Sequence, residues 1–264
     1  MTPDLLFWLA LVVKMAVTAG FVIAAAMAAQ RLGPLPGALI ATLPIAAAPA
    51  YIFLSFDHDS VFISQSALAS LAINPVTATF ALIYAVLGQR QSLSLSLPAA
   101  LIFWVLLAII VNSIQWSLLG AVAFNLVVFP FYLVVARHYR HAPMGPVHLR
   151  WRDIIVRGVM VALLVAAVVV LSFKIGPFAS GLLAVFPIVL LSIMFILHRR
   201  VGGPATAAVL ANAITGLIGL AGASIVLHVA AVPLGSALAM TLALGVSIGW
   251  GLLIYALRKR GIAL

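Results

Sequence analysis

Long apolar stretches, separated by short groups of polar residues, glycine or proline, follow one another along almost the whole chain. Each has about the 20 residues that an α-helix needs to cross the hydrocarbon core of a bilayer. The pattern predicts an all-α polytopic membrane protein. It has nine expected transmembrane helices, at residues 5–29, 35–55, 62–88, 98–114, 117–136, 154–173, 177–197, 204–228 and 233–257.

The apolar segment from Pro98 to Ala136 is about twice as long as one crossing requires. We therefore expect the chain to turn back between Asn112 and Gln115. The alternative is an eight-helix protein without this turn. It would put Arg31 and Arg90 outside and Asp57 and Asp59 inside, which fits the charge pattern less well.

Composition excludes a water-soluble domain, because 66% of the 264 residues are hydrophobic, 7% are charged, and the mean hydropathy is +1.31. The absence of cysteine excludes disulfides, thiolate zinc sites and iron–sulfur clusters. No motif predicts a catalytic residue, a bound metal or a cofactor. The three residues Asp57-His58-Asp59 do not converge easily on one ion and are expected to form a solvated turn.

The net charge of +10 does not indicate nucleic acid, because most of the 14 Lys and Arg residues lie in the short breaks between apolar stretches. Basic residues in short loops mark the cytoplasmic side. We therefore expect the N-terminus outside and the C-terminus inside, in the inner (plasma) membrane of a bacterium. The expected inner side receives Arg31, Arg90, Arg137, Arg140, Arg150, Arg152, Arg199, Arg200, Arg258, Lys259 and Arg260, and the outer side Asp4, Asp57, Asp59 and Lys174.

The two halves of the chain resemble each other when Gly33 is aligned with Gly176, a constant shift that we call the repeat register. It matches Gly33-Pro34 with Gly176-Pro177, and Pro44 with Pro187. It also matches Lys14 with Arg157, and Arg31 with Lys174. Such agreement favours an internal duplication over chance in an Ala- and Leu-rich chain.

Five predicted crossings separate the first helix from its counterpart, so the two copies should have opposite orientations in the membrane. The predicted organisation is a first repeat at 1–140, a basic cytoplasmic loop at 141–153 and a second repeat at 154–264. The fourth or the fifth helix has no counterpart in the second copy. Inverted repeats are typical of secondary transporters, in which equivalent halves open a central site alternately to each side.

Pro44 and Pro187 fall in the middle of predicted helices, where proline removes a backbone hydrogen bond and kinks or breaks the helix. Interrupted helices of transporters often line the substrate site. A kink that only serves packing is the alternative for each proline. Gly33, Pro34, Gly176 and Pro177 are expected to form helix turns with a structural role.

Two predicted helices carry a stripe of polar or small side chains at helical spacing. Such a stripe favours either close helix packing with interhelical hydrogen bonds or a polar translocation path. The asparagines are the strongest candidates, because a buried carboxamide needs several partners. The first stripe consists of Ser66, Ser70, Asn74 and Thr77, and the second of Asn212, Thr215, Gly219 and Gly222.

Lys14 lies about ten residues into the first apolar stretch, where a cation either marks a ligand path or extends to the membrane surface. Arg157 lies nearer its loop, so extension to the surface is the favoured interpretation there. No Asp or Glu falls inside a predicted helix. Cationic groups and helix N-termini then favour an anionic or zwitterionic substrate.

The function expected from these features is a small secondary transporter, importer or exporter, for a small organic solute or ion. The expected partners are the bilayer, a small-molecule substrate and, at the Arg-rich loop, anionic lipids, with a second copy of the chain as a further candidate. Two other classes remain as alternatives. One is a membrane-embedded lipid-modifying enzyme, and the other is a subunit of a membrane complex that does not itself transport.

Overall fold

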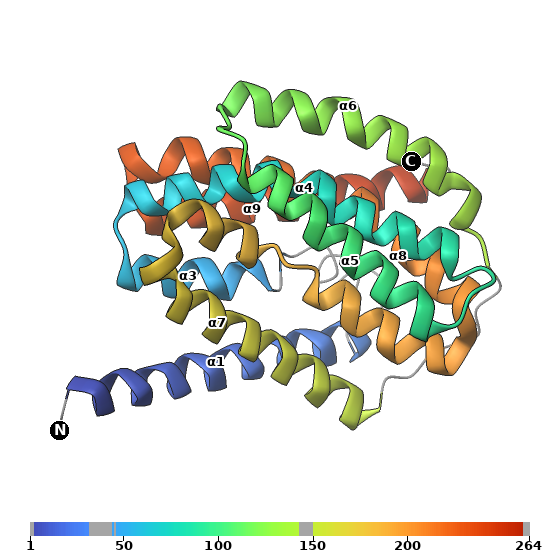
Figure 1. The fold of residues 1–264 in the computed structure, drawn as a ribbon, viewed down its shortest axis with the longest axis horizontal. Coiled ribbons are helices and arrows are strands. Elements are labelled where there is room, and N and C mark those ends of the chain that lie inside the picture. The colour runs from blue at the N-terminus through green and yellow to red at the C-terminus, as the bar shows by residue number, and fades with distance from the viewer. Residues whose placement is uncertain (1–2, 32–43, 45, 143–149, 261–264) are drawn as a thin grey trace.

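The computed structural model describes residues 3–31, 44, 46–142 and 150–260, and all regular structure within these ranges is helical. The helices run mostly side by side along the long axis of the molecule (Figure 1). They are α1 (Pro3–Arg31), α3 (Ala47–Asp57), α4 (Ser60–Leu87), α5 (Leu93–Asn112), α6 (Leu118–Ala136), the short η1 (Arg137–Tyr139), α7 (Trp151–Ala184), α8 (Ile188–Leu234) and α9 (Ser236–Lys259).

Seven of the described helices are long and apolar enough to cross a membrane: α1, α4, α5, α6, α7, α8 and α9. Their outward faces carry large apolar side chains, among them Leu119, Val127 and Phe131 of α6, which are 79%, 73% and 63% exposed. A surface so rich in exposed apolar groups is unstable in water but suits contact with lipid. These properties indicate an integral membrane protein.

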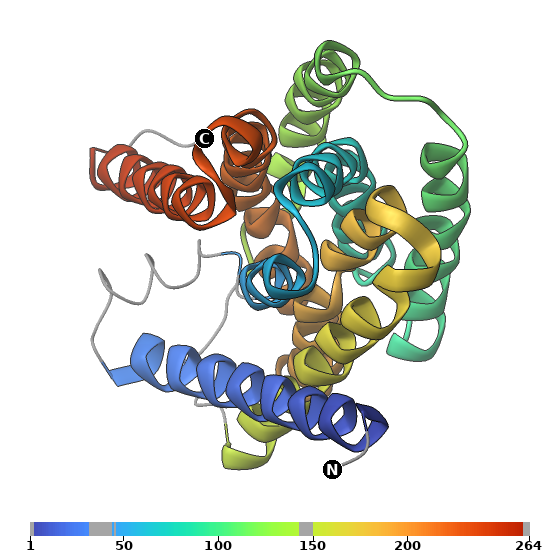
Figure 2. The same cartoon turned by 90° about the vertical axis from the view of Figure 1, so that its left-hand side faces the viewer.

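Helix α4 lies at the centre of the bundle (Figure 2). In its most apolar stretch 78% of the residues are buried, against 17% in α1 and α6 and 22% in α5. The buried side includes the small residues Ala69, Ala72 and Ala78, which let neighbouring helices approach closely. The N-terminus of α4 is capped by Asp59, whose Oδ1 accepts a hydrogen bond of 2.8 Å from the Phe62 amide.

The predicted turn after Asn112 is confirmed. Helix α5 ends at Asn112, and α6 begins at Leu118 after Ser117, whose hydroxyl accepts a hydrogen bond from the Gly120 amide. The predicted helix bounds of 98–114 and 117–136 are close to those observed, although α5 begins earlier, at Leu93. The eight-helix alternative, which lacks this turn, is therefore wrong on this point.

Two glycines with positive φ interrupt the long helices of the second half: Gly176 in α7, with φ of 75°, and Gly202 in α8, with φ of 82°. Glycine adopts this backbone region without the steric cost that a Cβ imposes. The helix turn predicted at Gly176 and Pro177 is thus present. Gly33 and Pro34 lie outside the described residues.

The predicted helix at 177–197 is not continuous. Helix α7 ends at Ala184, and α8 begins at Ile188 after Pro187, which has non-helical backbone angles. The predicted helix at 35–55 lies partly outside the described residues, and its described part is α3. The sequence therefore predicts nine crossings, whereas seven described helices have the length and apolarity that a crossing requires.

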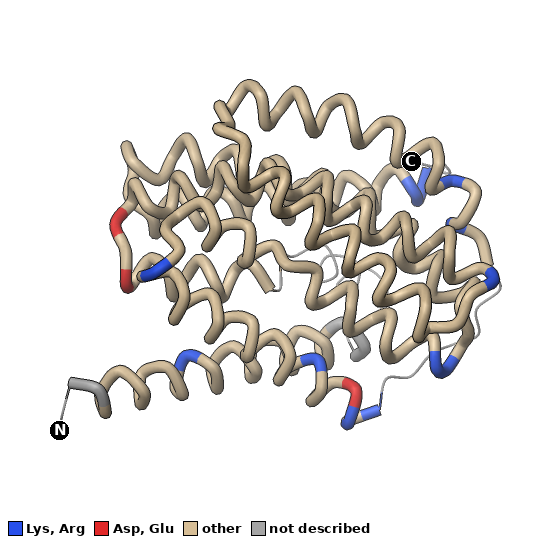
Figure 3. The backbone as a smooth tube through the Cα atoms, viewed as in Figure 1, with Lys and Arg blue, Asp and Glu red and all other residues tan. Residues whose placement is uncertain are grey.

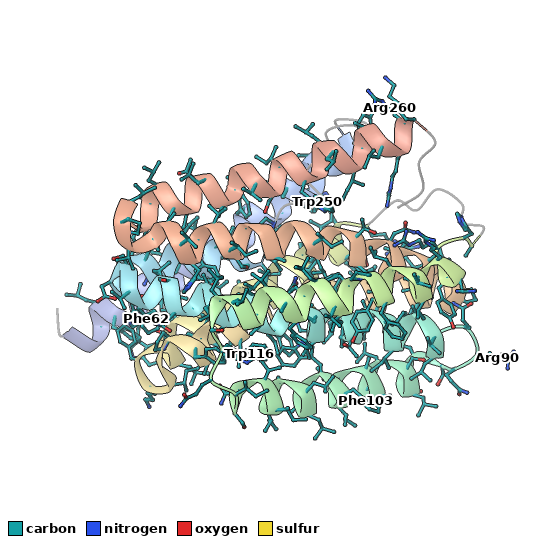
Figure 4. The ribbon with its side chains drawn as sticks, turned by 90° about the horizontal axis from the view of Figure 1, so that it is seen from above. Phe62, Arg90, Phe103, Trp116, Trp250 and Arg260 are labelled. Atoms are coloured by element: carbon teal, nitrogen blue, oxygen red, sulfur yellow. The ribbon has the colours of Figure 1, made fainter. Side chains whose placement is uncertain are left out.

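The two ends of the bundle differ in charge (Figure 3). Acidic residues lie at the end near the N-terminus, where α3 ends at Asp57 and Asp59 caps α4, and most Lys and Arg residues lie at the other end. Arg90 and Arg260 both lie at this basic end, on opposite sides of the bundle, and Phe62 lies at the other end (Figure 4). The described chain therefore begins and finishes at opposite ends of the bundle (Figure 1).

Candidate functional site

A cavity of about 690 Å³ lies between α7, α8, α9 and the segment that leads into α3. This volume falls in the range of small-molecule sites. Most of the lining is apolar, and five of the residues proposed from sequence contribute to it. These are Pro44, Thr77, Pro187, Asn212 and Thr215.

Pro44 and Pro187 line this cavity and stand in equivalent positions before a helix. The carbonyl of Pro44 accepts a hydrogen bond of 2.8 Å from Ala48 at the start of α3, and the carbonyl of Pro187 accepts one of 2.8 Å from Leu191 at the start of α8. Each proline therefore comes before the first turn of a described helix. The sequence predicted that both would interrupt a helix, and α8 does begin directly after Pro187.

Three cationic side chains line the cavity: Arg157 from α7, and Arg258 and Lys259 from the end of α9. The Nε atom of Arg157 is buried and has no hydrogen-bond partner among the described residues. No Asp or Glu of the described residues lines the cavity. The interior is therefore electropositive, a field that attracts anions.

Asn212 and Thr215 of α8 hold arginine side chains at the basic end of the cavity. The Arg258 guanidinium donates to Asn212 Oδ1 at 3.2 Å, and the Arg140 guanidinium donates to Thr215 Oγ1 at 3.1 Å. Asn212 also donates through Nδ2 to the Arg140 carbonyl at 3.3 Å. Burial, followed by the positive charges of Arg258 and Arg137, lowers the pKa of the Arg140 guanidinium.

The polar stripe of α4 is divided between packing and the cavity. Ser66 and Ser70 donate to the carbonyls of Pro177 and Gly181 on α7, at 2.9 and 2.8 Å. Asn74 donates to the Leu217 carbonyl of α8 at 2.9 Å and to Asn125 Oδ1 at 3.3 Å. These three residues tie α4 to its neighbours and do not line the cavity, whereas Thr77 does.

Lys14 does not line the cavity. Its Nζ donates to Asp57 Oδ2 at 2.6 Å, and the two side chains are 16% and 22% exposed. The contact joins α1 to the end of α3. Lys14 therefore has a structural ion pair in the described arrangement, although the sequence also offered it as a ligand-path residue.

The sequence did not predict Arg157, Arg258 or Arg140 as site residues, but the structure places them at the cavity or at its polar rim. For Arg157 the sequence favoured extension to the membrane surface, and it assigned Arg140 and Arg258 only to the charges of the expected inner side. One signal did single out Arg157, since the repeat register pairs it with Lys14. No local pattern in the sequence predicted that α9 would place Arg258 beside Asn212.

Comparison with protein families, curated proteins and solved structures finds no match for this chain. The functional interpretation therefore rests on the cavity, its charges and the arrangement of its helices.

Proposed function

We propose that the chain is a small secondary transporter that moves a small organic solute or ion, anionic or zwitterionic, by alternating access between two inverted repeats. The observation that carries this proposal is the cavity at which the helix starts after Pro44 and Pro187 meet. Freed backbone groups at interrupted helices are a recurrent feature of transporter substrate sites.

Helix boundaries in the two halves support the repeat. In the repeat register Ser60 corresponds to Gly203, and Leu93 to Ser236. Helix α4 begins at Ser60, and α8 resumes at Gly203 after the break at Gly202. Helix α5 begins at Leu93 and α9 at Ser236. Helix α6 is then the element of the first half that has no described counterpart.

The contact between α4 and α8 also agrees with a two-fold relation between the halves. Leu217 is the residue that matches Asn74 in the repeat register, and these two residues are joined by the 2.9 Å hydrogen bond from Asn74 Nδ2 to the Leu217 carbonyl. Equivalent positions touch each other only near the axis that relates two copies. An axis at this crossing places the cavity, whose wall includes Leu217, beside the centre of the molecule.

We assign the described arrangement to a state in which the cavity is accessible from the basic end of the bundle. Arg258 and Lys259 of that end line the cavity. Toward the opposite end, α4 is bonded to α7 by Ser66 and to α8 by Ser64, which donates to the His228 carbonyl at 2.8 Å. Opening to the other side would require these contacts to separate.

The test is a binding screen followed by a transport assay. Purified protein is heated with amino acids, carboxylates, metal ions and lipid phosphates, since a ligand of the folded state raises the unfolding temperature. Any stabilising solute is then offered, radiolabelled, to vesicles that contain the protein. We expect saturable uptake that empty vesicles do not show. A ligand that binds but never crosses the vesicle membrane would contradict transport.

A further inference from the structure

Arg157 is the most unusual cation of the cavity because its buried Nε lacks any hydrogen-bond acceptor in the described ranges of the chain. A buried guanidinium nitrogen without an acceptor or a paired anion is unfavourable. Most of the other residues that line the cavity are apolar, among them Leu190, Ile193 and Leu220. An environment of this kind leaves the positive charge poorly stabilised while the cavity holds no ligand.

The chain supplies few anions that could neutralise Arg157. The sequence has four acidic residues, and the three whose side chains the structure describes have partners: Asp57 pairs with Lys14, Asp59 caps α4, and Asp153 pairs with Arg200 and with the Arg150 amide. Residues 32–43 and 45, which border the segment leading into α3, contain no Asp or Glu in the sequence. A negative charge at this place is therefore best supplied by a ligand.

We propose that Arg157 binds the carboxylate of a small organic monoanion whose apolar body packs against the aliphatic wall of the cavity. This inference rests on the proposed function and names its substrate class. Arginine pairs with carboxylate through two parallel hydrogen bonds, which satisfies its buried donors. Arg258 and Lys259 add positive potential at the basic end. The aliphatic wall disfavours a small multiply charged ion, which would lose its hydration there.

The experiment uses benzoate as probe, with benzamide as its uncharged counterpart and benzylamine as its cationic one. Each is titrated into the purified full chain in neutral detergent, and the unfolding temperature is recorded. We expect benzoate to raise this temperature in a saturable manner, and we expect benzamide and benzylamine to leave it unchanged. Equal stabilisation by benzamide, or no stabilisation by benzoate, overturns the proposal.

Variants of arginines on the same helix locate the site. Arg157→Gln should weaken benzoate binding by about tenfold or more, because charge-assisted hydrogen bonds are lost, and Arg157→Lys should retain part of the affinity. Arg152→Gln removes an exposed arginine of α7 outside the cavity and serves as the matched control. Ligand-free Arg157→Gln should unfold at or above the wild-type temperature. Undiminished benzoate binding by folded Arg157→Gln overturns the proposal.

Two further measurements distinguish a lipid site from a solute site, and binding from transport. Stabilisation by phosphatidylglycerol but not by benzoate would overturn the proposal in favour of a lipid headgroup. Benzoate that binds through Arg157 but is not taken up by vesicles would uphold this inference and contradict transport. Saturable uptake of a neutral or cationic solute, unchanged by Arg157→Gln, would support transport and contradict this inference.

Discussion

Glycine at helix contacts decides how closely some helices of this protein approach. A Cβ added at Gly181 of α7 would lie 2.0 Å from the Ser66 carbonyl oxygen of α4, and one added at Gly203 of α8 would lie 1.9 Å from the Gly88 carbonyl oxygen. Backbone atoms cannot yield as a flexible side chain can. Close approach also brings Ser70 within 2.8 Å of the Gly181 carbonyl, so packing and hydrogen bonding depend on the same glycine.

Gly181→Ala should destabilise the protein by about 1–3 kcal/mol, because the added methyl group forces α4 and α7 apart. The measurement is the unfolding temperature in detergent. Gly245→Ala is the matched control, since no atom lies within 4 Å of a Cβ added there. Alanine at that exposed helix position should be neutral or stabilising by up to about 1 kcal/mol. An equal effect of both substitutions would exclude a special role for the Gly181 contact.

The ion pair of Lys14 and Asp57 permits a second residue-level prediction. Both side chains are mostly buried, so removal of one partner leaves the other charge in a poorly solvated place. Lys14→Met and Asp57→Asn should each lower stability by about 1–3 kcal/mol. The double variant should be less destabilised than the sum of the two single variants. Lys174→Met, which removes an exposed lysine, is the control, and strictly additive effects would count against the pair.

At the level of elements, proline has different effects on the helices at the cavity and on those away from it. The prolines that precede α3 and α8 lie on the cavity wall, whereas Pro75 and Pro130 lie inside α4 and α6, which remain continuous. Proline alone therefore does not break a helix here. The segments before α3 and α8 reach the cavity, where freed backbone groups can face a ligand or water rather than lipid, whereas Gly176 and Gly202 do not line it.

Pro44→Ala and Pro187→Ala should each lower transport while leaving membrane insertion intact. Alanine restores an N–H group and favours a continuous helix by about 3 kcal/mol. We expect initial uptake rates to fall by about tenfold, which corresponds to about 1.4 kcal/mol of that preference. Pro130→Ala, on the exposed side of α6, is the control and should transport normally. Normal flux in both test variants would remove these prolines from the mechanism.

At the level of the whole molecule, the proposed inversion makes a direct topological prediction. Gln91 and Leu234 are equivalent in the repeat register and should face opposite sides of the membrane. The protein contains no cysteine, so a single introduced cysteine can be labelled without reaction at any native thiol. Gln91→Cys and Arg260→Cys should react with a membrane-impermeant maleimide from one side, and Leu234→Cys from the other. Labelling of Gln91→Cys and Leu234→Cys from the same side would exclude an inverted repeat.

The parts of the fold that the sequence predicted are those that depend on neighbours along the chain. Apolar runs set the membrane-spanning class, polar residues after Asn112 allow the turn, and Gly176 provides a positive φ. Hydropathy alone predicted 177–197 as a single helix, and only Pro187 indicated the interruption that the structure has before Ile188. The stripe of α4 was found by its spacing, but spacing could not distinguish Thr77 at the cavity from Asn74 at a helix contact.

By itself, the sequence determined that this is a helical membrane protein with turns at particular glycine and polar positions, because transfer from water to lipid and backbone sterics act locally. Only the tertiary structure decided which cations have partners. Lys14 and Arg157 match in the repeat register, yet one reaches Asp57 while the other lines the cavity. That difference arises from helices distant in sequence, since charge pairing over a few ångströms is set by how those helices pack.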